Sequence, residues 1–188
     1  SSILENSASG FRIIGALSGF QCGICVRSAG DFNGDGVSDV IVSSPSAAAP
    51  SAEGAGVAYV IFGHSGPFEQ IDLLTMHSGP STGLRIYGTE EGTEGISILS
   101  GAGDINGDGI DDIVVGAPLY NGPGDKYSMG VAYVLFGHGT AMSYDNIPLA
   151  GLVADPRVGF TIHGAAGGDY FGNSVSNAGD VNGDGVDD

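Results

Sequence analysis

Short apolar runs alternate with glycine-rich polar turns along the whole chain. In the first part of the chain these runs span residues 11–14, 23–29, 39–43 and 57–62, and in the second part residues 84–87, 96–101, 112–115 and 131–136. β-Branched and aromatic residues dominate them, and Gly or Pro bounds nearly every run, which is typical of short β-strands. Helical spacing does not extend over ten residues anywhere, and only residues 70–76 predict a short helical turn. The pattern therefore predicts an all-β chain.

Three blocks of sequence recur in the same order. The first block reads GFRIIG (10–15), GLRIYG (83–88) and GFTIHG (159–164). The second is acidic and reads GDFNGDGVSDVIVSSP (30–45), GDINGDGIDDIVVGAP (103–118) and GDVNGDGVDD (179–188). The third reads GVAYVIFGH (56–64) and GVAYVLFGH (130–138). We therefore divide the chain into repeats at 1–82 and 83–158 and a partial repeat at 159–188.

Four short strands per repeat predict the blades of a β-propeller, each a four-stranded antiparallel sheet. A β-sandwich does not need near-identical copies. An isolated sheet of this size cannot bury both faces, so the blades must stack. We expect two full blades and part of a third, either as a fragment of a longer propeller or as partial propellers that associate between chains.

The charge balance excludes several classes of partner. The chain has 22 Asp and Glu against 5 Lys and Arg, a net charge of −17. Nucleic acids and anionic membrane surfaces are therefore disfavoured partners, because phosphate binding needs clustered Lys and Arg. No apolar run approaches the ~20 residues of a membrane span, so membrane insertion is not expected. An apolar fraction of 41% argues for a folded chain, which begins at Ser and is expected to be a mature or excised piece.

The acidic blocks have the ligand spacing of a calcium loop. Counted from the first Asp of each block, positions 1, 3, 5 and 9 carry oxygen-bearing side chains, position 6 is Gly, and position 7 offers its backbone carbonyl. The candidate ligands are Asp31, Asn33, Asp35, Val37 and Asp39; Asp104, Asn106, Asp108, Ile110 and Asp112; and Asp180, Asn182, Asp184, Val186 and Asp188. Hard oxygen ligands in this number favour Ca²⁺ over Mg²⁺, one ion per loop and up to three in the chain.

These loops begin like an EF-hand and then depart from it. An EF-hand has Glu at position 12, whereas position 12 here is Val42 or Val115 within an apolar run. The alternative interpretation is an Asx-turn hairpin whose surplus acids serve solubility. Position 8 carries Asp111 and Asp187, which we expect to point away from the ion as solvated charges.

With these motifs the chain resembles the FG-GAP repeat family, the blades of the integrin α-subunit propeller and its bacterial relatives. Phe171-Gly172 matches the FG element, and Val115-Gly116-Ala117-Pro118 matches the GAP element. The first repeat departs from both, with Cys22-Gly23 and Ser43-Ser44-Pro45 in their places. The resemblance implies a seven-bladed propeller with calcium in its blade loops. It also implies a secreted or cell-surface location and a role in adhesion or ligand binding.

The remaining polar residues do not assemble a catalytic motif, so we do not expect an enzyme. Cys22 and Cys25 form a CxxC, but residues three apart in a strand face opposite sides, which predicts buried structural thiols over a disulfide. His64 and His138 occupy equivalent places, which predicts packing or loop roles. Two other functions stay open: a lectin on the same fold, and a non-catalytic domain of a larger secreted enzyme. The sequence does not identify the protein or glycan ligand.

Overall fold

The computed structural model describes residues 10–50, 53–66, 70–89, 95–139 and 146–188. Almost all of its regular structure is β-strand, which confirms the all-β prediction. The strands are β1 (Ile13–Ile14), β2 (Val26–Gly30), β3 (Asp39–Ser44), β4 (Val57–Ile61), β5 (Ile71–Asp72), β6 (Gly83–Tyr87), β7 (Ile98–Gly103), β8 (Asp112–Ala117), β9 (Val131–Leu135), β10 (Ile147–Pro148) and β11 (Gly159–His163).

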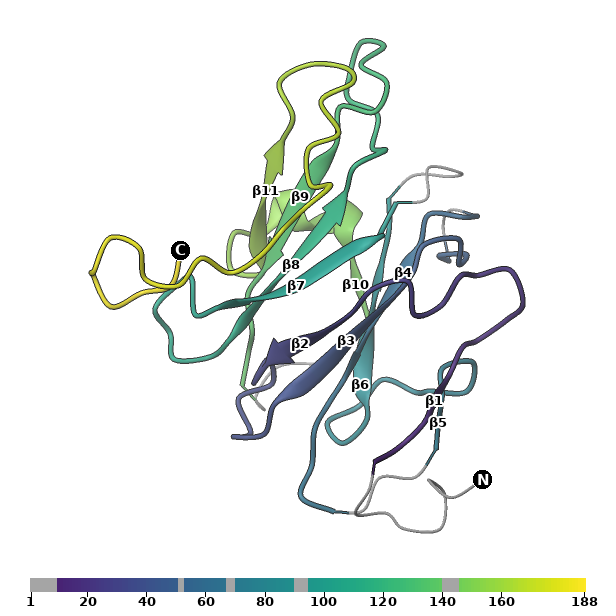
Figure 1. The fold of residues 1–188 in the computed structure, drawn as a ribbon, viewed down its shortest axis with the longest axis vertical. Helices are drawn as coiled ribbons and strands as arrows, with labels where there is room; N and C mark the ends of the chain where they lie inside the picture. Colours follow the sequence, from purple (N-terminus) through teal and green to yellow (C-terminus); the bar gives the residue numbers. More distant parts are fainter. Residues whose placement is uncertain (1–9, 51–52, 67–69, 90–94, 140–145) are drawn as a thin grey trace.

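Two antiparallel sheets with the same construction make up the molecule (Figure 1). In the first sheet, β2, β3, β4 and β6 pair in that order, and the short β10 adds to β6 in parallel. In the second sheet, β7, β8, β9 and β11 pair in the same order. β1 and β5 form a separate parallel pair beside the first sheet. The prediction of four-stranded antiparallel units is thus confirmed.

One hydrophobic core joins the two sheets. From the first sheet, Ile41, Val60 and Ile86 point into it, and from the second sheet Val115 and Leu135 meet them. Each of these five side chains is completely buried. Because every other residue of a strand faces the same side, Val42 and Tyr59 point to the opposite face of the first sheet, where Leu73 and Met76 cover them. The central strands are therefore apolar on both faces.

The second sheet leaves its outer face partly open. Val114 and Val134 lie on this face, together with the side chains of Phe160 and Ile162, which are 40% and 44% exposed. A hollow of about 770 Å³ lies over it. By repeat position, Ile162 corresponds to Ile86, which the second sheet buries completely. The open face of the second sheet is thus equivalent, by repeat position, to one face of the first sheet. In the first sheet that face is covered by the second sheet.

The sheets are out of phase with the sequence repeats by one strand. The motif GLRIYG begins the second repeat, yet β6 pairs with β4 and forms the outer strand of the first sheet. In the same way β11, from the third repeat, pairs with β9. Sequentially neighbouring repeats therefore share a sheet, which ties them together through backbone hydrogen bonds. The division at residues 82 and 158 remains a prediction about repeats and not about sheets.

One local prediction was wrong. Residues 70–76 contain β5 followed by a turn and not a helical turn, because Ile71 and Leu73 donate backbone bonds to Arg12 and Ile14 of the β1 segment. The helical turn lies instead at Leu149–Ala154, the 3-10 helix η2, whose Leu149 and Leu152 pack on the main core. Both short segments are decided by what they contact, since neither is long enough for a periodic pattern.

Candidate metal centre

The three acidic loops lie side by side at one edge of the molecule (Figure 1). The first connects β2 to β3 and the second connects β7 to β8, while residues 180–188 form the third. Neighbouring loops touch at equivalent positions. The Gly34 backbone lies against the side chain of Ile110, and the Gly107 backbone lies against that of Val186. The loops therefore form a stack with a regular step.

The first carboxylate of each loop organises the turn. In the first loop, Asp31 accepts hydrogen bonds from the N–H groups of Asp35 at 2.9 Å and Gly36 at 2.8 Å. Gly36 has a φ of 89°, in the left-handed region that favours glycine. Asp35 in turn accepts a bond from the Val37 N–H at 2.9 Å. The predicted sharp turn at position 6 is confirmed.

The second and third loops repeat this geometry. The Gly109 N–H donates to Asp104 at 2.8 Å, and the Gly185 N–H donates to Asp180 at 2.8 Å. The φ angles of the two glycines are 88° and 91°. The bond from Gly185 is the main reason that the pKa of Asp180 lies below its ordinary value. Three loops with different neighbours thus adopt one conformation.

The position 3 amides bring the ligand positions together. Asn33 donates to the Asp35 carboxylate at 3.0 Å, and Asn106 donates to Asp108 at 2.9 Å. In the third loop the equivalent amide of Asn182 reaches the Asp188 carboxylate at 3.4 Å. The position 3 amide therefore lies beside position 5 in the first two loops and beside position 9 in the third loop.

The position 9 carboxylates of the first two loops are buried. Asp39 accepts bonds from the N–H groups of Phe32 at 3.0 Å and Gly63 at 2.8 Å, which ties the loop to the end of β4. Burial raises the pKa of Asp39 to about 6, and the neighbouring charge of Asp35 adds to the shift, although both N–H bonds oppose it. Asp112 is held in the same way, and burial raises its pKa to about 6 as well. A buried carboxylate close to other carboxylates favours a nearby positive charge.

In the described part of the chain, no three side chains of His, Cys, Asp or Glu form a ready-made metal cluster. The carboxylates at positions 1 and 9 instead accept the backbone N–H bonds given above. The donor set nevertheless fits calcium, since each loop combines three carboxylates, an amide and a backbone carbonyl, all with oxygen donors. Burial is the main cause of the raised pKa of Asp112, and the charges of Asp108 and Asp104 add to it.

The position 8 side chains are not free charges, which corrects the sequence expectation. Asp111 is half-buried, and its Oδ2 accepts a bond from the backbone N–H of Asp31 at 2.8 Å. Asp187 accepts the equivalent bond from Asp104 at 3.1 Å. Each of these carboxylates therefore reaches the first residue of the preceding loop. The sequence carried no signal for this, because the contact spans two repeats.

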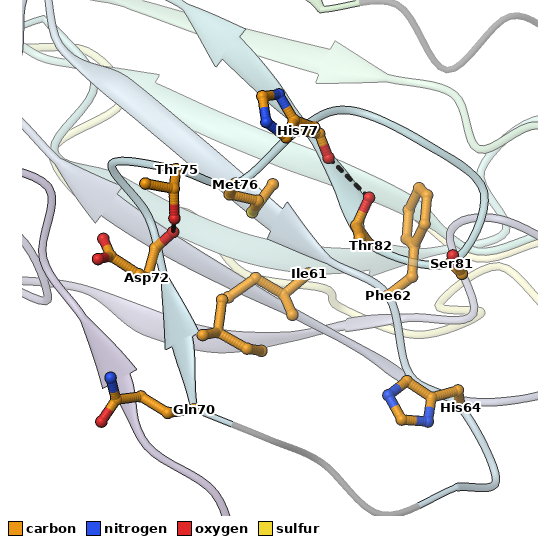
Figure 2. A pocket seen from close by; sticks show the side chains of 11 residues that line it. Ile61, Phe62, His64, Gln70, Asp72, Thr75, Met76, His77, Ser81 and Thr82 are labelled. Carbon is orange, nitrogen blue, oxygen red and sulfur yellow. Dashed lines mark hydrogen bonds between the residues drawn. The ribbon is translucent and has the colours of Figure 1, made fainter.

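A second hollow, of about 380 Å³, lies beside β5 (Figure 2). Ile61 and Met76 contribute apolar surface, and polar side chains including Asp72, His77 and Thr82 surround them. The Thr82 hydroxyl donates to the carbonyl of His77 at 2.7 Å, which closes the turn on one side of the hollow. None of the predicted metal ligands lines this hollow.

The cysteines and the repeated histidine take part in packing. Cys25 faces the main core and Cys22 faces the cluster on the other side of the first sheet, and both are free thiols. Burial raises the pKa of the Cys22 thiol. His138 donates its backbone N–H to Phe32 at 3.1 Å, and the two rings meet edge to face with centroids 5.4 Å apart. The predicted structural role of the thiols agrees with these positions.

Comparison with known proteins identifies the repeats. Residues 28–61 and 98–135 match the FG-GAP repeat family. The chain therefore carries FG-GAP repeats, and its two antiparallel sheets agree with blades of an FG-GAP β-propeller.

Three relatives show how the similarity is distributed. The chain is 32% identical to integrin alpha-PS5 of Drosophila melanogaster over 161 residues, which cover 84% of this chain and 13% of that protein. It is 38% identical to integrin alpha-E of Mus musculus over 92 residues, 48% of this chain and 7% of that protein. It is 31% identical to phosphatidylinositol-glycan-specific phospholipase D of Dictyostelium discoideum over 119 residues, 57% of this chain and 12% of that protein. The chain thus spans only a small part of the length of these relatives. In the described residues, no helix is long and apolar enough to cross a membrane.

Proposed function

We propose that this chain is a calcium-stabilised, non-catalytic propeller module that is secreted or displayed on a cell surface and binds an adhesion ligand. One observation carries the proposal: an identical ligand order occurs three times, and all three loops fold alike around their first carboxylate. Solubility alone requires neither a fixed order of Asp and Asn nor a buried Asp at position 9.

Calcium in these loops acts as a structural ion. In the first loop, Asp31, Asn33, Asp35, Asp39 and the Val37 carbonyl hold it, and the other two loops use the equivalent residues. An ion of charge +2 offsets much of the repulsion among three carboxylates, and it favours the charged form of Asp39 that burial disfavours. The loops join neighbouring strands of each blade, so the ion stiffens the edge at which blades meet.

Thermal unfolding with calcium and with chelator tests the metal role. We expect the melting temperature to rise with calcium concentration, because an ion that binds only the folded state stabilises it by mass action. The matched control replaces position 5 in every loop, as Asp35→Ala, Asp108→Ala and Asp184→Ala together, and its melting temperature should not respond to calcium. If the melting temperature of folded wild-type protein does not change at millimolar calcium, the metal role is wrong and the Asx-turn interpretation remains.

The binding role rests on the integrin alpha relatives, and the ligand is a protein or a glycan. A lectin function stays an alternative, because Phe160, Tyr170 and Phe171 line the hollow over the second sheet and are 40%, 49% and 37% exposed, and sugar platforms need open rings. The phospholipase relative keeps open a role as the non-catalytic part of a larger secreted enzyme. A glycan array and a cell-adhesion assay with the same protein distinguish the adhesion function from the lectin function.

We also propose that copies of this chain associate through the open face of the second sheet. That face carries the partly exposed side chains of Phe160 and Ile162. The equivalent face of the first sheet is covered by the second sheet. A second copy presents the same open apolar face, so the two faces match in chemistry.

A further inference from the structure

Neighbouring acidic loops are joined by the same hydrogen bond at two successive steps. Asp111, at position 8 of the second loop, accepts the N–H of Asp31 in the first loop at 2.8 Å. Asp187, at position 8 of the third loop, accepts the N–H of Asp104 in the second loop at 3.1 Å. The Asp187 N–H also donates to the carbonyl of Asp104 at 3.1 Å. Because the same hydrogen bond recurs between equivalent atoms, it is a property of the repeated structure and not of one local contact.

The backbone is shaped to admit these carboxylates. Gly30 and Gly103 precede the first Asp of their loops, with φ angles of 67° and 70°, and each lies at a bulge in its strand pair. A Cβ on Gly30 would collide with the Asp111 carboxylate, and a Cβ on Gly103 would collide with that of Asp187. The first loop has Ser38 at position 8, and this residue is exposed where Asp111 and Asp187 are half-buried.

We propose that Asp111 and Asp187 are positioning residues that couple calcium occupancy between neighbouring loops, so that an ion in one loop raises the affinity of the loop before it. This inference rests on the proposed calcium function. Asp111 lies between Ile110 and Asp112, which supply positions 7 and 9 of the second loop. An ion held there fixes the backbone on both sides of Asp111 and therefore its carboxylate. That carboxylate in turn holds Asp31, the first ligand of the preceding loop.

The sign of the coupling separates this mechanism from simple electrostatics. Two ions of charge +2 in adjacent loops repel one another, so loops without a mechanical link fill independently or with negative cooperativity. The hydrogen bond opposes this, because the second ion binds a loop whose first ligand is already ordered. Linkage makes the effect reciprocal, so an ion in the first loop raises the affinity of the second by the same factor.

The experiment is a calcium titration followed by NMR through the amide resonances of Gly36, Gly109 and Gly185. Each of these N–H groups donates to the first carboxylate of its own loop, so each reports one loop. Asp108→Ala removes a ligand from the second loop. We expect it to raise the calcium midpoint of Gly36 by about fivefold or more, the lower range of measured coupling factors.

A double-mutant cycle assigns the coupling to Asp111. In the Asp111→Ala background, adding Asp108→Ala should leave the Gly36 midpoint unchanged. Asp111→Asn keeps an oxygen acceptor for the Asp31 N–H without the charge, so it should preserve the coupling. Ser38→Ala is the control at position 8 of the first loop. It should change neither the calcium midpoint of Gly36 nor that of Gly109. If Asp111→Ala does not fold, Asp187→Ala with Gly109 as the reporter tests the equivalent step.

The outcomes separate this inference from the function on which it rests. Loops that bind calcium, with a Gly36 midpoint that Asp108→Ala does not change, overturn the coupling and leave the metal function intact. Coupling that persists in the Asp111→Ala background overturns the role of that carboxylate. A folded protein in which none of the three glycine resonances responds to calcium overturns both.

Discussion

The Oδ2 atom of Asp111 lies 2.8 Å from the backbone nitrogen of Asp31, although the two residues are 80 positions apart. The bond links the last turn of one acidic loop to the first residue of another. It gives a neighbouring pair of blades a contact that is polar, directional and adjacent to the candidate ligands. A hydrophobic core alone is not directional, so this bond helps to fix how one blade sits on the next.

Leu135→Ala should destabilise the protein strongly. Leu135 is completely buried in the core shared by the two sheets, and truncation of such a side chain costs about 2–5 kcal/mol. Val181→Ala is the control, because Val181 is 72% exposed and its truncation should change stability by less than about 0.5 kcal/mol. Urea unfolding at fixed calcium measures both. Equal midpoints for the two variants would contradict the assignment of a common core.

Gly36→Ala should destabilise the first loop through the backbone alone. The φ of Gly36 is 89°, and a Cβ at this position meets no atom within 4 Å, so the penalty is conformational and about 1–3 kcal/mol. Gly36→Asn should reduce the stability less than Gly36→Ala, because Asn tolerates the left-handed region better than Ala. Thermal unfolding in chelator compares them without a metal contribution. A larger loss for Asn than for Ala would show that space and not φ limits the site.

Ile86→Asp and Ile162→Asp should differ sharply although the residues are equivalent in the repeat. Ile86 is completely buried between the sheets, so a charge there should prevent folding. Ile162 is 44% exposed on the open face of the second sheet, so its variant should fold and should weaken self-association. Sedimentation over a range of concentrations measures the second effect. A wild-type protein that stays monomeric at every concentration would argue against association through this face.

Cys25 should react with a thiol reagent only when the protein unfolds. Its side chain is 7% exposed within the main core, with Sγ 3.6 Å from the carbonyl oxygen of Leu99. Cys22 lies on the other side of the sheet, and its raised pKa disfavours the reactive thiolate. The labelling rate of each thiol, read by mass spectrometry in increasing urea, checks this. An intact mass that is lower by two hydrogens before labelling would reveal a disulfide and contradict the structure.

The strands and the acidic turns could be read from the sequence because their signals are local. Residues 39–43 and 112–115 were expected as strands and form the cores of β3 and β8. The glycine at position 6 was expected to turn the loop, and Gly36 does so with a positive φ. A period of two, a bounding Gly and an Asp that accepts nearby N–H bonds all act within a few residues. These features therefore leave a pattern in a single chain.

Only the tertiary structure decided how the repeats combine. It placed β6 in the sheet of the preceding repeat, turned residues 70–76 into β5 and a turn, and directed Asp111 toward Asp31. Each of these outcomes depends on partners that are distant in sequence, and such contacts leave no periodic trace in the segment itself. By itself the sequence determined the all-β class, the repeat and the order of the candidate ligands. The fold decided which carboxylates accept bonds within their own loop and which reach the neighbouring blade, because that choice is made by packing between repeats.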